Sequence, residues 1–228
     1  MKKYLAIAVL MIVTATSLTA QCKVGKTAAP TGFWTWAPES RVKVYVSTSD
    51  FDAAEVPYLV APLAKWNAVS ETTGSRVKLE YHGTTATPLY CQNCLTITRG
   101  HVFDKAKRHL TELRTYSAAR NEIMTWAGIV VDPRLTNPKT LTNAVAHELG
   151  HSFGLLDCYT CRKNSTVMNQ FDAVNTASEL QGPSSCDVVQ VKTQYQAVAA
   201  KPIHLKPIVV EEGEEPVEDD TPIVVPKP

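Results

Sequence analysis

The sequence predicts one mixed domain of the α/β or α+β class, and three observations lead to this prediction. Residues 41–46 alternate between polar and β-branched side chains, which is typical of a strand, and a helical pattern follows them. Further strand patterns come next, and the last two segments are helices with capping signals. The 228 residues, 44% of them hydrophobic and 20% charged, suffice for one domain with a buried core. The net charge of +1 gives no reason to expect nucleic acid or an anionic membrane as a partner.

The first 20 residues have the layout of a secretory signal peptide. Lys2 and Lys3 precede an apolar run at 5–13, and small and polar residues follow up to Ala20. The apolar run is too short to cross a bilayer, since a membrane-spanning helix needs roughly 20 residues. We therefore expect an exported protein, secreted or periplasmic, with no transmembrane segment. Cys22, close to the predicted cleavage site, leaves lipid anchoring as an alternative.

The C-terminal segment differs in composition from the rest of the chain. Residues 201–228 contain six prolines and seven acidic side chains, and they repeat the sequence Pro-Ile-Val-Val. Such a segment buries little apolar surface, so we predict a disordered or extended tail that acts as a spacer. A tether or a partner-binding strand is the alternative. Residues 21–200 are then the folded domain.

The domain begins with the strand at 41–46 and a helical pattern at 53–69. Pro57 and Pro62 fall within that pattern and indicate a late start or a kink. Three later segments are predicted as strands, at 77–82, 95–99 and 122–132. Residues 101–120 are basic, and their pattern leaves a loop plus an edge strand open. Within them, the run from Lys105 to Arg108 fits a solvated surface, with the lining of a substrate groove as the alternative.

Two helices with clear boundaries complete the domain. Asn137 is a suitable N-cap, Pro138 fits the first helical position, and Gly154 ends this helix. Ser184 and Asp187, three residues apart, form a capping pair that predicts the start of the final helix. The apolar stripes of the two helices are Leu141, Val145, Leu149 and Phe153 in the first, and Val188, Val191, Tyr195 and Val198 in the second.

Six cysteines lie beyond the predicted signal peptide: Cys22, Cys91, Cys94, Cys158, Cys161 and Cys186. An even number in an exported protein favours disulfides. We prefer two local bridges, Cys91–Cys94 and Cys158–Cys161, with Cys22–Cys186 joining the ends of the domain. The two CxxC pairs leave a structural zinc site as the alternative. A redox-active pair is not favoured, because neither CxxC lies in a strand-to-helix setting.

The strongest functional signal is the segment HELGHSFGLLD at 147–157. His147 and His151 are four residues apart on the predicted helix, so both imidazoles lie on one face and can bind one zinc ion. Glu148 can reach a water molecule at that zinc. Gly154 tolerates positive φ, which allows a sharp turn that brings the Asp157 carboxylate back as a third ligand. Three protein ligands leave a fourth position for water.

The HExxHxxGxx pattern followed by a third ligand resembles the signature of the metzincin zinc endopeptidases. STVMNQ at 165–170 resembles the methionine turn of that family, in which Met168 lies beneath the metal as an apolar floor. Aspartate as third ligand, with Cys158 directly after it, is similar to snapalysin-like and matrixin-like bacterial members. The resemblance implies a metzincin fold: a twisted, mostly parallel sheet of about five strands, two packed helices, an active-site helix, the methionine turn and a C-terminal helix.

The resemblance also implies a function. The expected protein is a monomeric zinc endopeptidase that hydrolyses extracellular polypeptides, with one catalytic Zn²⁺ and Glu148 as general base. The alternative is a catalytically inactive module of the same fold that binds zinc and a partner, although the intact Glu148 argues against it. Two ligand alternatives stay open, namely Cys158 in place of Asp157 and Cys22 as an N-terminal latency ligand.

Overall fold

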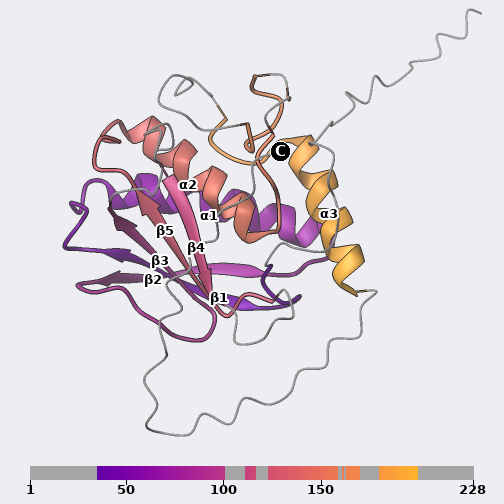
Figure 1. Cartoon of the computed structure of the whole chain (residues 1–228), viewed down its shortest axis with the longest axis horizontal. Helices are drawn as coiled ribbons and strands as arrows, with labels where there is room; N and C mark the ends of the chain where they lie inside the picture. The colour runs from indigo at the N-terminus through magenta and orange to yellow at the C-terminus, as the bar shows by residue number, and fades with distance from the viewer. Residues whose placement is uncertain are drawn as a thin grey trace, which may run out of the picture.

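The computed structural model describes residues 35–100, 111–116, 123–158, 161, 163–169 and 180–199. The predicted signal peptide, Cys22, the basic run at 105–108 and the predicted tail lie outside the described residues. Within these ranges, five strands and three helices follow the order β1-α1-β2-β3-β4-β5-α2-α3 (Figure 1). The mixed class predicted from the sequence is therefore confirmed.

The sheet has the strand order β2-β1-β3-β5-β4, in which β4 alone is antiparallel to its neighbour. The strands are β1 Arg41–Ser47, β2 Lys78–Thr85, β3 Cys94–Arg99, β4 Thr111–Tyr116 and β5 Trp126–Val131. This confirms the prediction of a mostly parallel sheet of about five strands. It also shows that the segment at 101–120 includes an edge strand, which is β4. The other predicted strands differ from the observed ones at their ends, where boundaries are hardest to place.

Strand β5 is buried on both faces, whereas β1 buries mainly one. In β1 the alternation seen in the sequence puts Val42, Val44 and Val46 in the core, whereas every residue of β5 is buried. The loop at 86–93 packs against β5, since the Trp126 indole donates a hydrogen bond to the Leu89 carbonyl at 2.6 Å. Burial on both faces is the usual setting for a continuous apolar strand in a parallel sheet.

Helix α1, Val56–Thr73, begins three residues later than predicted and continues through Pro62. Pro62 has no N–H to donate to the Tyr58 carbonyl four residues earlier. That carbonyl accepts a hydrogen bond from Thr142 Oγ1 of α2 instead, at 2.9 Å. Trp66 Nε1 also donates to the Ala146 carbonyl of α2, at 2.9 Å. The Tyr58 carbonyl, which Pro62 leaves without a helical donor, therefore accepts one of two hydrogen bonds that join α1 to α2.

Helix α2, Pro138–Ser152, has the predicted cap, because Asn137 Oδ1 accepts from the N–H groups of Lys139 and Thr140. Its predicted apolar stripe is buried. Figure 1 shows α1 and α2 side by side on one face of the sheet. Helix α3, Ser185–Ala199, contacts α1, and its Tyr195 hydroxyl donates to the Trp36 carbonyl at 3.1 Å. No helix in the described ranges has the length and apolarity needed to cross a membrane.

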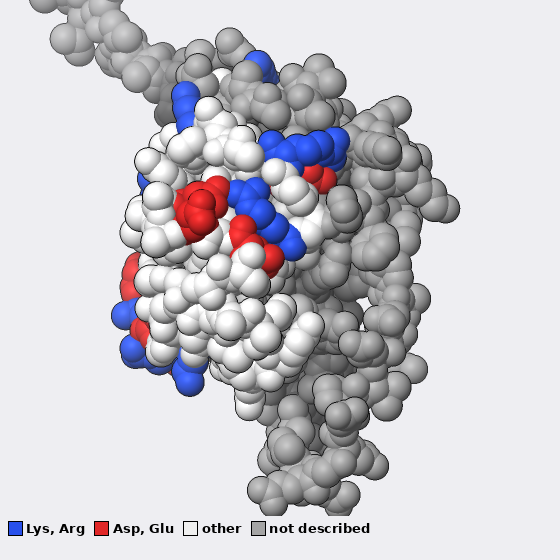
Figure 2. Space-filling view, turned by 90° about the vertical axis from the view of Figure 1, so that its left-hand side faces the viewer, with Lys and Arg blue, Asp and Glu red and all other residues white. Residues whose placement is uncertain are grey.

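Charged side chains of both signs lie next to one another on the face shown in Figure 2. Ion pairs between described residues include Arg76–Glu39 at 2.8 Å and Arg134–Asp132 at 2.7 Å. This mixed pattern agrees with the net charge of +1. It offers no single-sign surface, over the described part of that face, that would attract a polyanion.

Candidate metal centre

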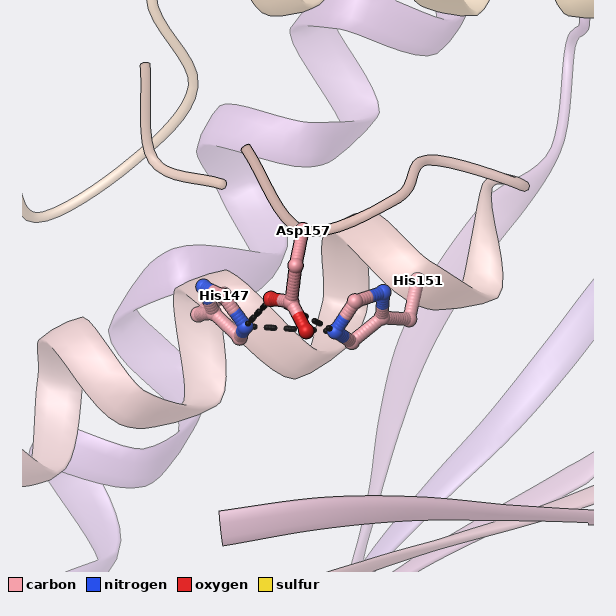
Figure 3. Close-up of side chains that lie close together, drawn as sticks. All are labelled: His147, His151 and Asp157. Atoms are coloured by element: carbon pink, nitrogen blue, oxygen red, sulfur yellow. Dashed lines mark hydrogen bonds and ion pairs between the residues drawn. The ribbon is translucent and has the colours of Figure 1, made fainter. Parts of the chain in front are cut away.

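Three side chains predicted as metal ligands converge on one point. His147 and His151 project from the same face of α2, and their Nε2 atoms are 3.1 Å apart. The chain turns after α2 and brings one oxygen of Asp157, Oδ1, to 3.0 Å from His147 Nε2 and 3.6 Å from His151 Nε2 (Figure 3). No other group of three or more His, Cys, Asp or Glu side chains in the described residues forms such a cluster.

The spacing of these three atoms fits a zinc ion. Ligand atoms about 2.05 Å from a tetrahedral zinc lie about 3.3 Å from one another. The three observed separations of 3.0, 3.1 and 3.6 Å lie on either side of that value. Two imidazole nitrogens and one carboxylate oxygen are also a donor set found in catalytic zinc sites. The residues present therefore fit the metal that the sequence motif implies.

Backbone carbonyl groups orient both histidines. His147 Nδ1 is 2.9 Å from the Val167 carbonyl, and His151 Nδ1 is 2.7 Å from the Leu155 carbonyl. A carbonyl can only accept, so each Nδ1 carries the proton and donates it. When the ring is neutral, as metal binding requires, its Nε2 has a lone pair directed at the cluster. Such contacts fix the tautomer and ring orientation of metal-binding histidines.

Gly154 makes the turn that delivers Asp157. Its φ is +82°, in the left-handed region that favours glycine. A Cβ at this position would also lie 2.5 Å from the Thr35 side chain and 2.9 Å from Gln194. The turn is closed by hydrogen bonds from Gly154 N–H to the His151 carbonyl at 2.8 Å and from Leu155 N–H to the Gly150 carbonyl at 3.1 Å. The predicted role of Gly154 is confirmed.

Met168 lies against α2 at Gly150. Its side chain is 1% exposed, and a Cβ added to Gly150 would overlap its sulfur. The same Cβ would lie 3.2 Å from the Trp66 ring. Gly150 falls between His147 and His151 in the sequence, so the absence of a side chain there lets Met168 approach the helix closely. That Met168 forms the floor of a metal site stays a prediction.

We predict that Gly150→Ala lowers the free energy of unfolding by about 1–3 kcal/mol, because it overpacks the contact with Met168. Helix propensity alone favours alanine over glycine by about 1 kcal/mol, so a net loss of stability would show that the new methyl group overlaps Met168. Urea unfolding of metal-free protein measures the effect. The double variant Gly150→Ala/Met168→Ala should lose less stability than the two single variants lose together, because the alanine at 150 fills space that the shortened side chain at 168 leaves. A Gly150→Ala protein as stable as wild type would contradict this packing.

Asp187 supports the site in a way that its sequence pattern does not reveal. As the capping pair predicts, its carboxylate accepts from the Ser184 N–H, at 2.6 Å. It also accepts from the Val167 N–H at 3.0 Å and from the Thr166 hydroxyl. Val167 is the residue whose carbonyl orients His147. The buried Asp187 carboxylate therefore joins the start of α3 to Thr166 and Val167 and, through the Val167 carbonyl, to His147.

The cysteines form disulfides within the described residues. Cys91–Cys94 and Cys158–Cys161 are bridged as predicted, which contradicts the alternative of a structural zinc site built from both CxxC pairs. Cys186 is also disulfide-bonded, whereas its predicted partner Cys22 lies outside the described residues. Because a disulfide sulfur is not a thiolate, Cys158 is not available as a zinc ligand in this state.

Glu148 follows His147 on α2 and is 2% exposed. It is not one of the three residues whose donor atoms converge. Its negative charge nevertheless acts on His147, since it contributes to raising the pKa of that imidazole. Glu148 is therefore a buried carboxylate directly next to one of the three cluster residues along the helix.

His147 gives the metal-free protein a pH-dependent stability. Burial lowers the pKa of His147, but the hydrogen bond to Asp157 and the charges of Asp157 and Glu148 outweigh it and raise the pKa from 6.5 to about 9. The native state therefore binds this proton more tightly than the unfolded chain does. The resulting stabilisation, on the order of 3 kcal/mol, is fully present below pH 6.5 and is lost as the pH rises to about 9.

We accordingly predict that the free energy of unfolding of the metal-free protein falls between pH 6.5 and pH 9. Urea unfolding at several pH values, in the presence of a chelator, measures it. His147→Gln is the control, and its profile should be flatter across this window. A wild-type stability that stays constant or rises from pH 6.5 to pH 9 would show that His147 is not held as an imidazolium in the metal-free state.

Comparisons with known proteins give a likeness of structure only. No family model matches the sequence, and no curated protein matches it. Among solved structures, the chain is similar to archaemetzincin from Methanopyrus kandleri, with 13% identity and a TM-score of 0.40. The match covers 69% of this chain and 96% of that one. At this identity and score the likeness assigns neither a family nor an activity.

Proposed function

We propose that the protein is a zinc-dependent endopeptidase whose metal is held by His147, His151 and Asp157. The observation that carries the proposal is the set of three donor atoms, which are separated by 3.0–3.6 Å. Backbone carbonyls orient the two histidines of this set. The buried Glu148 carboxylate lies on the same helix. A metal-binding protein without catalysis has no need of a carboxylate beside the ligands, so Glu148 favours an enzyme.

The reaction is hydrolysis of a peptide bond. A zinc ion bound to these residues would supply a Lewis acid for the scissile carbonyl and would acidify water. Glu148 removes a proton from the attacking water molecule and passes it to the nitrogen of the leaving amine as the C–N bond breaks. Asp157 makes the site less positive than three histidines would, so the water is less acidified and Glu148 has the larger part of the proton transfer.

Strand β4 offers a place for an extended polypeptide. It is the last strand of the sheet, pairs with β5 on one side, and contacts α2, which carries the ligands (Figure 1). An extended chain can add to such an edge through main-chain hydrogen bonds, largely independently of its sequence. Binding along a strand suits cleavage within a chain rather than at its end. Together with the signal peptide expected at residues 1–20, this supports extracellular polypeptides as substrates.

The proposal is tested by measuring zinc content and peptide cleavage on the same preparation. We expect one zinc per chain and cleavage at internal bonds of a peptide library, read by mass spectrometry. Removal of zinc with a chelator should abolish cleavage, and one equivalent of zinc should restore it. A folded, zinc-loaded protein that cleaves nothing in a broad library would contradict the enzyme and favour the inactive binding module.

A further inference from the structure

The disulfide Cys158–Cys161 directly follows the third member of the cluster, Asp157. The Cys158 side chain is 1% exposed, and its N–H donates to the Met168 carbonyl at 2.7 Å. At the other end of the bridge, the Cys161 carbonyl accepts from Asn169 Nδ2 at 3.2 Å. Both ends of the disulfide are therefore attached to the segment that contains the methionine turn.

This places Asp157 between two fixed points. On its N-terminal side, the Leu155 carbonyl accepts from His151 Nδ1 at 2.7 Å. On its C-terminal side, Cys158 is held by the bridge and by its pairing with Met168 and Asn169. Asp157 itself has a side chain that is 19% exposed. The contacts of its carboxylate include those to the two histidines, and its backbone is held by the neighbours on either side.

We propose that the Cys158–Cys161 disulfide positions Asp157 for metal binding, so that the site binds zinc tightly only when the bridge is oxidised. The inference rests on the proposed metal site. Without the bridge, the segment after Asp157 gains conformations in which the carboxylate points away from the histidines. Zinc then has two firmly placed ligands instead of three, and its affinity falls. Oxidation restores the third ligand.

The redox step is ordinary thiol–disulfide exchange with a dithiol. One thiolate of the dithiol attacks a sulfur of the bridge, which forms a mixed disulfide and releases the other cysteine as a thiolate. The second thiolate of the dithiol then displaces the remaining cysteine and closes its own disulfide. Two electrons pass from the dithiol to the protein, and each released thiolate takes up one proton at a pH below its pKa.

Zinc affinity would then depend on the redox state of the compartment in which the protein is located. Dithiols and glutathione keep cysteines reduced in the cytosol, whereas exported proteins form disulfides. A chain with the signal peptide expected here would bind zinc weakly before export and tightly after it. Peptide hydrolysis would then be confined to the compartment in which the bridge forms.

The chain contains a matched control. Cys91–Cys94 has the same CxxC spacing but lies at the start of β3, whose first residue is Cys94, and its surrounding hydrogen bonds join Asn93 to Thr125 and to Lys43. None of these contacts involves the three cluster residues. Removing this second bridge therefore tests the general effect of losing a CxxC disulfide without touching Asp157.

The experiment compares wild type, Cys158→Ser/Cys161→Ser and Cys91→Ser/Cys94→Ser. Zinc dissociation constants are measured by competition with a chromophoric chelator, after confirming that each protein is folded. We expect roughly 10–100-fold weaker binding for the first variant, the range for loss of a residue that supports a metal ligand, and at most about 3-fold for the second. Wild type reduced with a dithiol, which is then removed without oxygen, should match the first variant. Equal affinities for all four samples would overturn the proposal.

A double-mutant cycle separates positioning from general stability. In an Asp157→Asn background, loss of the bridge should weaken zinc binding no further, because the bridge acts through Asp157. An additive loss would overturn the proposal and indicate a structural role alone. A sulfur-to-metal charge-transfer band in the reduced, cobalt-substituted protein would also overturn it, by showing a cysteine thiolate as ligand. Zinc affinity is measured without substrate, so a failure of the peptidase proposal leaves this test unaffected.

Discussion

Glu148→Ala is expected to lower kcat/KM for peptide cleavage by roughly 10²–10⁴-fold, the usual contribution of a general base, while zinc content stays at one per chain. Activity and zinc content should respond differently to this substitution because of where Glu148 lies. Glu148 lies outside the cluster of converging donor atoms, so its removal leaves all three ligands in place. Cleavage rates on a defined peptide and zinc analysis of the same sample provide the measurement.

The control for this substitution is Glu71→Ala. Glu71 lies in α1, is exposed, and forms an exposed ion pair with Lys78 at 3.7 Å, which is worth little. Its removal should change neither activity nor zinc content. A Glu148→Ala enzyme that cleaves at the wild-type rate would contradict the assigned mechanism. Loss of zinc together with activity would instead give Glu148 a structural role at the site.

Asp157→Asn is expected to weaken zinc binding by more than the 10–100-fold that loss of an outer supporting residue costs. Asparagine keeps the size of the side chain but replaces the anionic oxygen with a neutral amide. The remaining ligands are the two imidazoles, whose Nε2 atoms are 3.1 Å apart. Activity at limiting zinc should fall with the affinity. Competition with a chelator measures the dissociation constant.

The matched control is Asp52→Asn, which makes the same chemical change at an exposed position in the loop before α1. Its zinc affinity should equal that of wild type. Unchanged affinity in Asp157→Asn would remove the carboxylate from the ligand set. In that case Cys158, next in the chain, would again be the alternative, and thiol titration of the zinc-loaded protein would reveal it.

The sequence predicts the parts of the site that depend on short separations along the chain. Helix pitch alone places His147 and His151 on one face, and the φ preference of glycine delivers Asp157 through the turn at Gly154. The Asn137 cap and the two CxxC bridges are local as well, and the structure has them where expected. In each case the interacting residues are within a few positions of one another, so pattern and spacing are sufficient.

The contacts that fix this site in the fold are long-range and leave no local pattern. The bond from Thr142 to the Tyr58 carbonyl spans 84 residues and exists because Pro62 frees that carbonyl. From the sequence, Pro57 and Pro62 indicate a late start or a kink, and in the structure α1 starts late, at Val56, and continues through Pro62. For Asp187, the sequence predicts only the contact with Ser184, which is three residues away. Its contact with the Val167 N–H, 20 residues away, leaves no pattern in the sequence. Such partners become known only once the chain is folded.

The measurement that tests the metal centre most directly is a crystal structure of the zinc-loaded protein with anomalous scattering recorded at the zinc edge. The predicted result is a single strong peak about 2.0–2.2 Å from His147 Nε2, His151 Nε2 and an Asp157 carboxylate oxygen, with the Cys158–Cys161 bridge intact. A zinc peak about 2.3 Å from a cysteine sulfur, or a peak away from the two histidines, would contradict the assignment of this site.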